Sequence, residues 1–184
     1  AALVALLALV AACGGGDETG RPDRAVVYGP EAGASAGAAV AGDFNGDGTP
    51  DLALGAALAD PDAARPDAGE VRIMLGPISP GDAKDAAEDS DVVIYGAGEG
   101  DQLGRRLATG DFDADGVDDL AIAAPSASNE AGEIHVLFGS SELGKKPNLF
   151  DLAASPPGPR VLGADPSDFA GASLAAGDFD ADGA

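Results

Sequence analysis

The feature that most constrains the fold is an acidic segment that recurs along the chain. Residues 42–54 read GDFNGDGTPDLAL, residues 110–122 read GDFDADGVDDLAI, and a third copy begins at residue 177 and reaches the last residue, Ala184. The copies are 68 and then 67 residues apart, and a Tyr-Gly or Leu-Gly pair keeps a 67-residue interval elsewhere in each unit. Copies that stay in phase in this way indicate an array of similar structural units.

Within one interval the apolar pattern predicts four short β-strands. The expected strands are residues 38–41, 52–55, 70–75 and 91–95 in the first unit, and residues 105–109, 119–123, 133–138 and 161–163 in the second. In the expected strand at residues 133–138, the side chains of Ile134, Val136 and Phe138 share one face. Residues 80–91 are expected to form a solvated loop. The 28 Gly and 13 Pro punctuate the whole chain, which disfavours long helices.

A four-stranded unit of this size cannot bury both faces alone, so the units are expected to stack on one another. Radial stacking of four-stranded sheets is a β-propeller. The predicted fold class is therefore all-β, a partial β-propeller with about two and a half blades. The first unit has one residue fewer before its acidic segment, so its first strand is expected to be irregular. Residues 24–29 repeat the fourth-strand pattern ahead of that segment, and we expect this strand to be mispaired or loose.

The acidic segment places oxygen ligands on alternate residues of a tight turn, with Gly at the sixth position permitting the reversal. This pattern suits a hard cation such as calcium better than magnesium, which keeps its water and demands stricter geometry. The candidate ligands, at positions 1, 3, 5, 7 (through the carbonyl) and 9, are Asp43, Asn45, Asp47, Thr49 and Asp51 in the first loop, and Asp111, Asp113, Asp115, Val117 and Asp119 in the second; Asp178, Asp180 and Asp182 begin a third.

Two alternatives to this calcium site can be weighed on the residues. An EF-hand or dockerin needs a bidentate Glu at position 12 and continues into a helix, whereas this chain has Leu54 or Ile122 there and continues as a predicted strand. Those two loop types are therefore excluded. A solvated acidic turn that binds no metal is the remaining alternative.

The shared core Gly-Asp-Phe-Asx-x-Asp-Gly-x-x-Asp-Leu-Ala resembles the FG-GAP repeat, which forms the blades of the integrin alpha-subunit propeller and of many bacterial surface proteins. The core is matched in full twice, whereas the Phe-Gly pair that names the repeat is replaced by Ala36-Gly37, Leu103-Gly104 and Ala170-Gly171. The resemblance covers residues 24–184. Because such propellers usually have about seven blades, it implies that these residues are an incomplete propeller.

The start of the chain has a different character. Residues 1–12 form an apolar run that is too short to span a bilayer and is typical of a signal-peptide core. The run ends in Val10-Ala11-Ala12-Cys13, which resembles the lipobox of bacterial lipoproteins, where the signal is cut before a Cys that is then lipidated. Residues 13–23 would then be the lipidated Cys13 and a flexible linker. An incidental Cys after an ordinary signal, or the end of a longer transmembrane helix, are the alternatives.

Charge and motif content narrow the function. The chain has 32 Asp and Glu against 10 Lys and Arg, a net charge of −22, which excludes nucleic acid as the main partner. No catalytic triad order and no phosphate-binding loop is present, so we expect no catalytic residues and no organic cofactor. The one histidine, His135, is expected to be a surface or inter-blade side chain rather than a catalytic base.

These observations predict a calcium-binding, extracytoplasmic, lipid-anchored propeller for adhesion or protein–protein interaction at a bacterial cell surface. Its ligand would be a protein or carbohydrate, and its contact with the membrane would be through the lipid anchor only. One alternative is an accessory module of a secreted hydrolase or lyase whose catalytic domain follows Ala184. A propeller enzyme that uses its own central channel is a third possibility.

Overall fold

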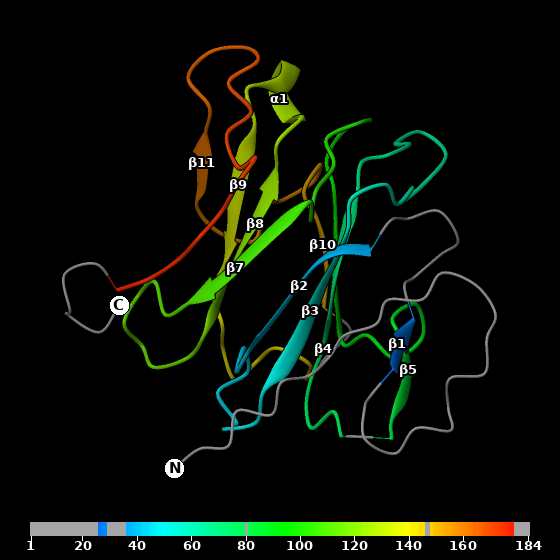
Figure 1. The fold of residues 1–184 in the computed structure, drawn as a ribbon, viewed down its shortest axis with the longest axis vertical. Coiled ribbons are helices and arrows are strands. Elements are labelled where there is room, and N and C mark those ends of the chain that lie inside the picture. Colours follow the sequence, from blue (N-terminus) through cyan, green and yellow to red (C-terminus); the bar gives the residue numbers. More distant parts are fainter. Residues whose placement is uncertain (1–25, 29–35, 80, 146–147, 179–184) are drawn as a thin grey trace.

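The computed structural model describes residues 26–28, 36–79, 81–145 and 148–178. This part of the chain is almost entirely β-structure, with one short helical turn (Figure 1). Its elements are β1 (Val26–Tyr28), β2 (Ala36–Gly42), β3 (Asp51–Ala56), β4 (Glu70–Met74), β5 (Ala83–Asp85), β6 (Val92–Tyr95), β7 (Arg106–Gly110), β8 (Asp119–Ala124), α1 (Ala127–Glu130), β9 (Glu133–Leu137), β10 (Asn148–Asp151) and β11 (Arg160–Leu162). Among the described residues, no helix is long and apolar enough to cross a membrane.

Each repeat forms one antiparallel sheet, which confirms the predicted propeller blades. The first blade has the strand order β6-β4-β3-β2 and the second has the order β11-β9-β8-β7. All eight predicted strands are present, with ends within two residues of the expected ones. The pairing of β2 with β3 shifts register between Ala36 and Ala38, so the first strand is irregular as predicted. The acidic loops lie at one end of the blades, and α1 lies at the other (Figure 1).

The two blades share one hydrophobic core. The second strand of each blade, β3 or β8, is buried along its whole length. The large side chains packed between the blades include Val71, Ile73 and Ile94 from the first blade and Leu107, Leu120 and Ile122 from the second. The backbones also approach closely, because a Cβ added to Gly55 would lie 2.0 Å from the carbonyl oxygen of Gly104. Glycine at this position therefore permits the blades to pack.

The third strand of the second blade alternates as expected but buries the more polar of its faces. Glu133, His135 and Leu137 are buried, whereas Ile134 and Val136 are half-buried and Phe138 is exposed. The buried polar pair is tolerated because the His135 Nε2 and Glu133 Oε2 atoms lie 3.2 Å apart and partner each other. His135 is therefore an inter-blade side chain, one of the two positions predicted for it.

The connection that leaves each blade repeats in its hydrogen bonds. After β6, two backbone N–H groups donate to the loop that precedes β4, and after β11 the equivalent groups donate to the loop that precedes β9. The donor and acceptor pairs are Gly96 with Gly69, Leu103 with Ala68, Gly163 with Gly132, and Ala170 with Ala131, each 2.9 Å. The chain therefore leaves the second blade along the path by which it left the first.

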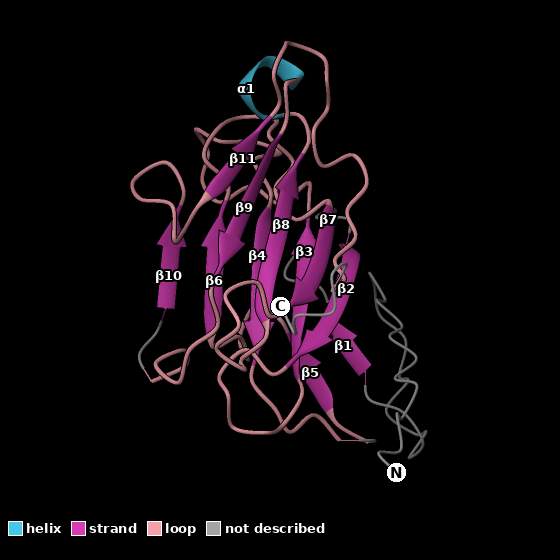
Figure 2. Cartoon of the chain, turned by 90° about the vertical axis from the view of Figure 1, so that its left-hand side faces the viewer, coloured by secondary structure: helices cyan, strands magenta, loops and turns pink. Residues whose placement is uncertain are grey.

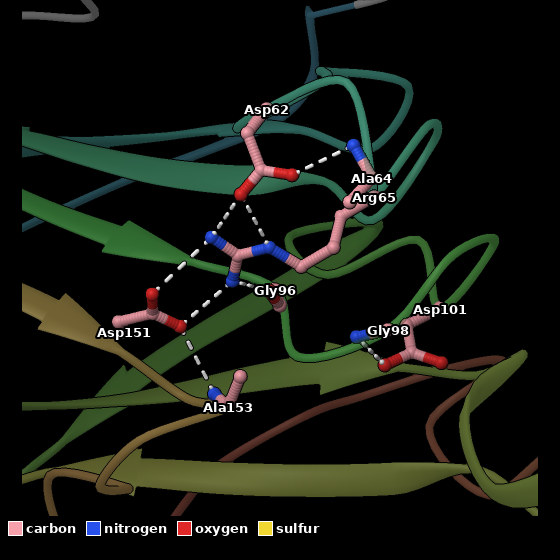
Figure 3. A network of polar contacts seen from close by, with 8 residues as sticks. All are labelled: Asp62, Ala64, Arg65, Gly96, Gly98, Asp101, Asp151 and Ala153. Atoms are coloured by element: carbon pink, nitrogen blue, oxygen red, sulfur yellow. Dashed lines mark hydrogen bonds and ion pairs between the residues drawn. The ribbon is translucent and has the colours of Figure 1, made fainter.

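Two strands of the described residues, β10 and β5, were not predicted. β10, which belongs to the second repeat, pairs in parallel with β6 and extends the first sheet to five strands (Figure 2). Arg65 holds this strand from the loop between β3 and β4, with 2.7 Å between its Nη1 and the Asp151 Oδ1 atom, and it also binds Asp62 and the Gly96 carbonyl (Figure 3). The two blades are thus joined at the sheet edge as well as through the core.

The second additional strand is β5, which lies inside residues 80–91, so the prediction that this segment is only a solvated loop was wrong. β5 pairs in parallel with β1, the described part of the orphan strand predicted at residues 24–29. β1 therefore pairs outside both blades. The predicted signal segment, Cys13 and the linker lie outside the described residues.

Candidate metal sites in the acidic loops

The two acidic loops form the same tight reversal between the first and second strands of their blades. Two residues in each loop have a positive φ angle: Gly46 (69°) and Gly48 (83°) in the first, and Ala114 (60°) and Gly116 (87°) in the second. Only Gly adopts this conformation without steric cost, and Ala pays roughly 1–2 kcal/mol for it. The reversal turns successive polar side chains to the inside of the loop.

The second loop brings three carboxylates together. One oxygen each from Asp111, Asp113 and Asp115 lies within 4.8 Å of the others, and the last two of these side chains are exposed. The backbone holds the arrangement in place, because Asp115 N and Gly116 N donate to the Asp111 carboxylate at 3.1 and 2.9 Å. Three carboxylates arranged in this way repel one another, and a bound cation would remove that repulsion.

The first loop repeats these bonds with one negative charge fewer. Asp47 N and Gly48 N donate to the two oxygens of Asp43 at 3.0 and 2.7 Å. Asn45 takes the place of the middle carboxylate and donates from its Nδ2 to Asp47 at 3.0 Å. This bond, followed by the one from Thr49 N, lowers the pKa of Asp47 from its usual value. The first loop thus has the same form with a weaker negative field.

The aspartates at position nine, Asp51 and Asp119, lie beneath the loops. Each is 1% exposed, and each accepts two backbone hydrogen bonds. Asp51 binds Phe44 N (2.9 Å) and Gly76 N (2.7 Å), and Asp119 binds Phe112 N (2.6 Å) and Gly139 N (2.8 Å). Burial raises the pKa of both carboxyl groups, against the effect of these hydrogen bonds.

The structure therefore divides the predicted ligands into two groups. The side chains at positions one, three and five surround the loop centre, whereas the one at position nine ties the loop to the segment just after the blade's third strand. A carboxylate oxygen has two lone pairs, so this structural role is compatible with metal ligation as well. Thr49 and Val117, predicted to offer carbonyls, each donate their N–H to the carboxylate at position five, at 2.8 Å. Of the third set, Asp178 is described and exposed, and Asp180 and Asp182 lie outside the described residues.

One residue at the loops was not anticipated from the sequence. Asp118 accepts a hydrogen bond from Asp43 N at 2.8 Å, and its own N–H donates to the Asp43 carbonyl at 3.1 Å. The second blade thus holds the first loop from outside. The only signal in the sequence is the Asp118-Asp119 pair, which stands where the first copy has Pro50-Asp51.

Comparison with known proteins agrees with these loops and blades. A sequence model described as the FG-GAP repeat matches residues 35–74 and 103–137, each of which spans one acidic loop and the first three strands of a blade. The chain contains two FG-GAP repeats. These repeats form non-catalytic propeller modules that serve protein interaction.

The chain is also similar to part of a much longer protein. The chain is similar to phosphatidylinositol-glycan-specific phospholipase D from Homo sapiens, with 34% identity over 119 residues. The match covers 58% of this chain and 14% of the human protein. The chain therefore spans about one seventh of the length of that relative.

Proposed function

We propose that the chain is a calcium-binding, extracytoplasmic propeller module whose surface binds a partner in adhesion or assembly. The observation that carries this proposal is the cluster of Asp111, Asp113 and Asp115 in a loop whose backbone already holds the carboxylates in place. Oxygen donors on alternate residues suit calcium. FG-GAP repeats in integrins bind calcium, and such domains are typically extracellular, which supports both the ion and the location.

Calcium would act on the module through its stability. Binding to the folded form alone stabilises a protein by RT ln(1 + [L]/Kd). With a Kd on the order of 10⁻⁴ M, as in extracellular modules, about 2 mM calcium contributes roughly 1.8 kcal/mol per site. For a chain of this length that corresponds to a rise in Tm of about 4 to 7 °C.

The experiment compares thermal unfolding and titration calorimetry in calcium and in chelator. Asp111→Ala combined with Asp115→Ala should remove one calcium site and most of the rise in Tm that the site provides. Glu88→Ala combined with Glu99→Ala is the matched control, because it removes the same charge from exposed residues outside the loops and should keep both sites. Identical melting of the folded wild type in calcium and in chelator would mean that the loops are acidic turns without a metal.

The proposed partner is a protein or carbohydrate at the cell surface. We propose in addition that a lipid on Cys13 anchors the chain to the membrane. Incorporation of labelled palmitate into the wild type but not into Cys13→Ser is the expected result for the anchor. Equal labelling of both proteins would rule the anchor out.

A second candidate function is an accessory module of a secreted hydrolase or lyase. The similarity to the human phospholipase favours this candidate, because the matched segment is about one seventh of a longer protein that is named as an enzyme. The complete open reading frame distinguishes the two candidates. Further blades alone support adhesion, whereas an adjoining segment rich in His and Asp supports the accessory role.

A further inference from the structure

A surface cleft of about 350 Å³ lies at the end of the second blade where α1 lies, away from the acidic loops (Figure 1). Two repeats contribute to it. The start of β7 and the two residues that precede α1 come from the second repeat, whereas Phe169 and Ala172 come from the segment that leads to the third acidic loop. Among the described residues that line the cleft, none is Asp or Glu, although the chain has 32 of them.

The cleft contains two arginines that have no carboxylate partner. Arg105 and Arg106 are both exposed and both line it. Other basic side chains of the described residues form ion pairs, namely Arg65, Arg72, Lys145 and Arg160. Arg105 and Arg106 form none with any described residue. In a chain with a net charge of −22, this is a local excess of positive charge.

The hydrogen bonds of the two arginines leave most of their donors available. Arg105 Nη1 donates to Gln102 Oε1, and Arg106 Nη1 donates to the Arg105 carbonyl at 2.8 Å. A guanidinium group has five N–H donors, so each group retains several that no described residue accepts. The hydroxyl of Ser126, which also lines the cleft, makes no capping bond to α1. The polar wall therefore has more donors than acceptors.

The other repeats show that the fold does not need these arginines. Two residues follow the Leu103-Gly104 pair, and their counterparts are Ala38 and Ala39 in the first repeat and Ala172 and Ser173 in the third. With its alanines, β2 pairs with β3 in the antiparallel manner in which β7 pairs with β8. Since a blade forms with small side chains at these positions, the arginine pair is available for binding.

Phe169 gives the cleft an apolar surface beside the arginines. The residue is 39% exposed, and its N–H donates to the Glu130 carbonyl at 2.8 Å, which holds this segment against α1. A ligand that fits such a wall has a carboxylate for the arginines, hydroxyl groups for the polar side chains and a C–H face for the ring. A hexuronate, the acidic form of a sugar, combines all three. An acidic peptide offers the carboxylate without the hydroxyl-bearing ring.

We infer that this cleft binds a hexuronate unit of an acidic carbohydrate, with its carboxylate on Arg105 and Arg106 and its ring against Phe169. Guanidinium groups bind carboxylates through paired N–H donors, which gives these contacts both strength and direction. Repulsion from distant acidic residues is screened beyond about 8 Å at physiological ionic strength. This site rests on the proposed function in that it gives the module a partner, but it lies apart from the acidic loops, so sugar binding and calcium binding can fail separately.

The test is a titration of the full chain in constant calcium at about pH 7, with the arginine Nε–H signals followed by ¹⁵N NMR. Loss of a signal in Arg105→Gln or in Arg106→Gln assigns it. Methyl glucuronide should shift both signals in a saturable way. Methyl glucoside, which has the ring without the charge, and acetate, which has the charge without the ring, should each bind at least about tenfold more weakly.

Variants locate the binding. Arg105→Gln combined with Arg106→Gln should fold, because small residues occupy these positions in the first repeat, and should weaken methyl glucuronide binding at least about tenfold. Phe169→Ala should weaken it less. Lys84→Gln combined with Lys145→Gln is the matched control, because it removes two positive charges from residues that do not line the cleft, and its affinity should equal that of the wild type.

Several results would overturn the inference. These are unchanged arginine signals, full affinity in the double arginine variant, or binding of acetate or methyl glucoside as tight as that of methyl glucuronide. A triglutamate peptide that bound as tightly as methyl glucuronide would overturn the choice of a sugar and indicate an acidic protein segment instead. Calcium titration of the same samples tests the metal loops independently, so the glucuronide result decides this site whatever the loops bind.

Discussion

The two acidic loops have nearly the same sequence and different surroundings. Phe44 of the first loop is 1% exposed, whereas its counterpart Phe112 in the second is 38% exposed. The second blade covers the first loop with Asp118, which exchanges hydrogen bonds with Asp43, and with Ser140, whose N–H donates to the Phe44 carbonyl at 2.9 Å. The comparison teaches that a loop of this type is completed by the next repeat, so the shape of the proposed metal site depends on blade packing.

The largest expected difference between the loops concerns the two phenylalanines. Phe44→Ala should lower the free energy of unfolding by about 3–5 kcal/mol, because it empties a fully buried site between the blades. Phe112→Ala should cost less than half as much, since that ring is partly in solvent. Urea unfolding of both variants measures the difference. Equal losses would show that the first loop is not covered in solution.

The two loops should respond alike to loss of the aspartate at position nine, because this residue is buried in both. Asp51→Ala and Asp119→Ala each leave two backbone N–H groups without their acceptor, and each should lower stability by about 2–3 kcal/mol. The loss should persist in chelator. Asp113→Ala, at an exposed position, should lower stability only when calcium is present. If the two position-nine variants matched the wild type in chelator, these aspartates would act as ligands alone.

The smallest expected effect concerns the polar pair of the second blade, Glu133 and His135. Burial lowers the pKa of His135 below its value in the unfolded chain, against the raising effect of Glu133 and in the same direction as the charge of Arg160. The unfolded chain therefore binds a proton first, so stability is full above about pH 6.5 and falls as the pH drops through the lower folded pKa.

Urea unfolding between pH 8 and pH 5.5 isolates this effect when the wild type is compared with His135→Gln. The stability of the wild type relative to the variant should decrease as the solution is acidified, because the carboxylates titrate in both proteins and cancel. A difference between the proteins that does not vary with pH would contradict the assignment of a buried, neutral His135.

The sequence predicted what depends on local pattern. The eight blade strands follow from alternation and repetition, and the meeting of Asp111, Asp113 and Asp115 follows from their spacing in a tight turn. The burial of the position-nine aspartates could not be read in the same way. Their oxygens are fixed by N–H groups of Gly76 and Gly139, which are 20 or more residues away in the chain.

Contacts between distant segments of the chain could not be predicted from the sequence either. β10 and β5 have only four and three residues, and each pairs with a strand from a distant segment, so no local periodicity indicates them. The pairing of Arg65 with Asp151 joins residues 86 positions apart. The buried face of β9 was hidden for a related reason, because the polar Glu133 and His135 are acceptable inside only as partners of each other.

The position of β10 at the edge of the first sheet has a consequence for synthesis of the protein. The ribosome delivers β6 well before β10, so the outer edge of the first blade remains open while the second blade is being translated. An open strand edge is a template for pairing with other chains. The first blade therefore reaches its final form only when the second has emerged far enough to lend it a strand, and a nascent chain halted between the two would be the species most in need of a chaperone.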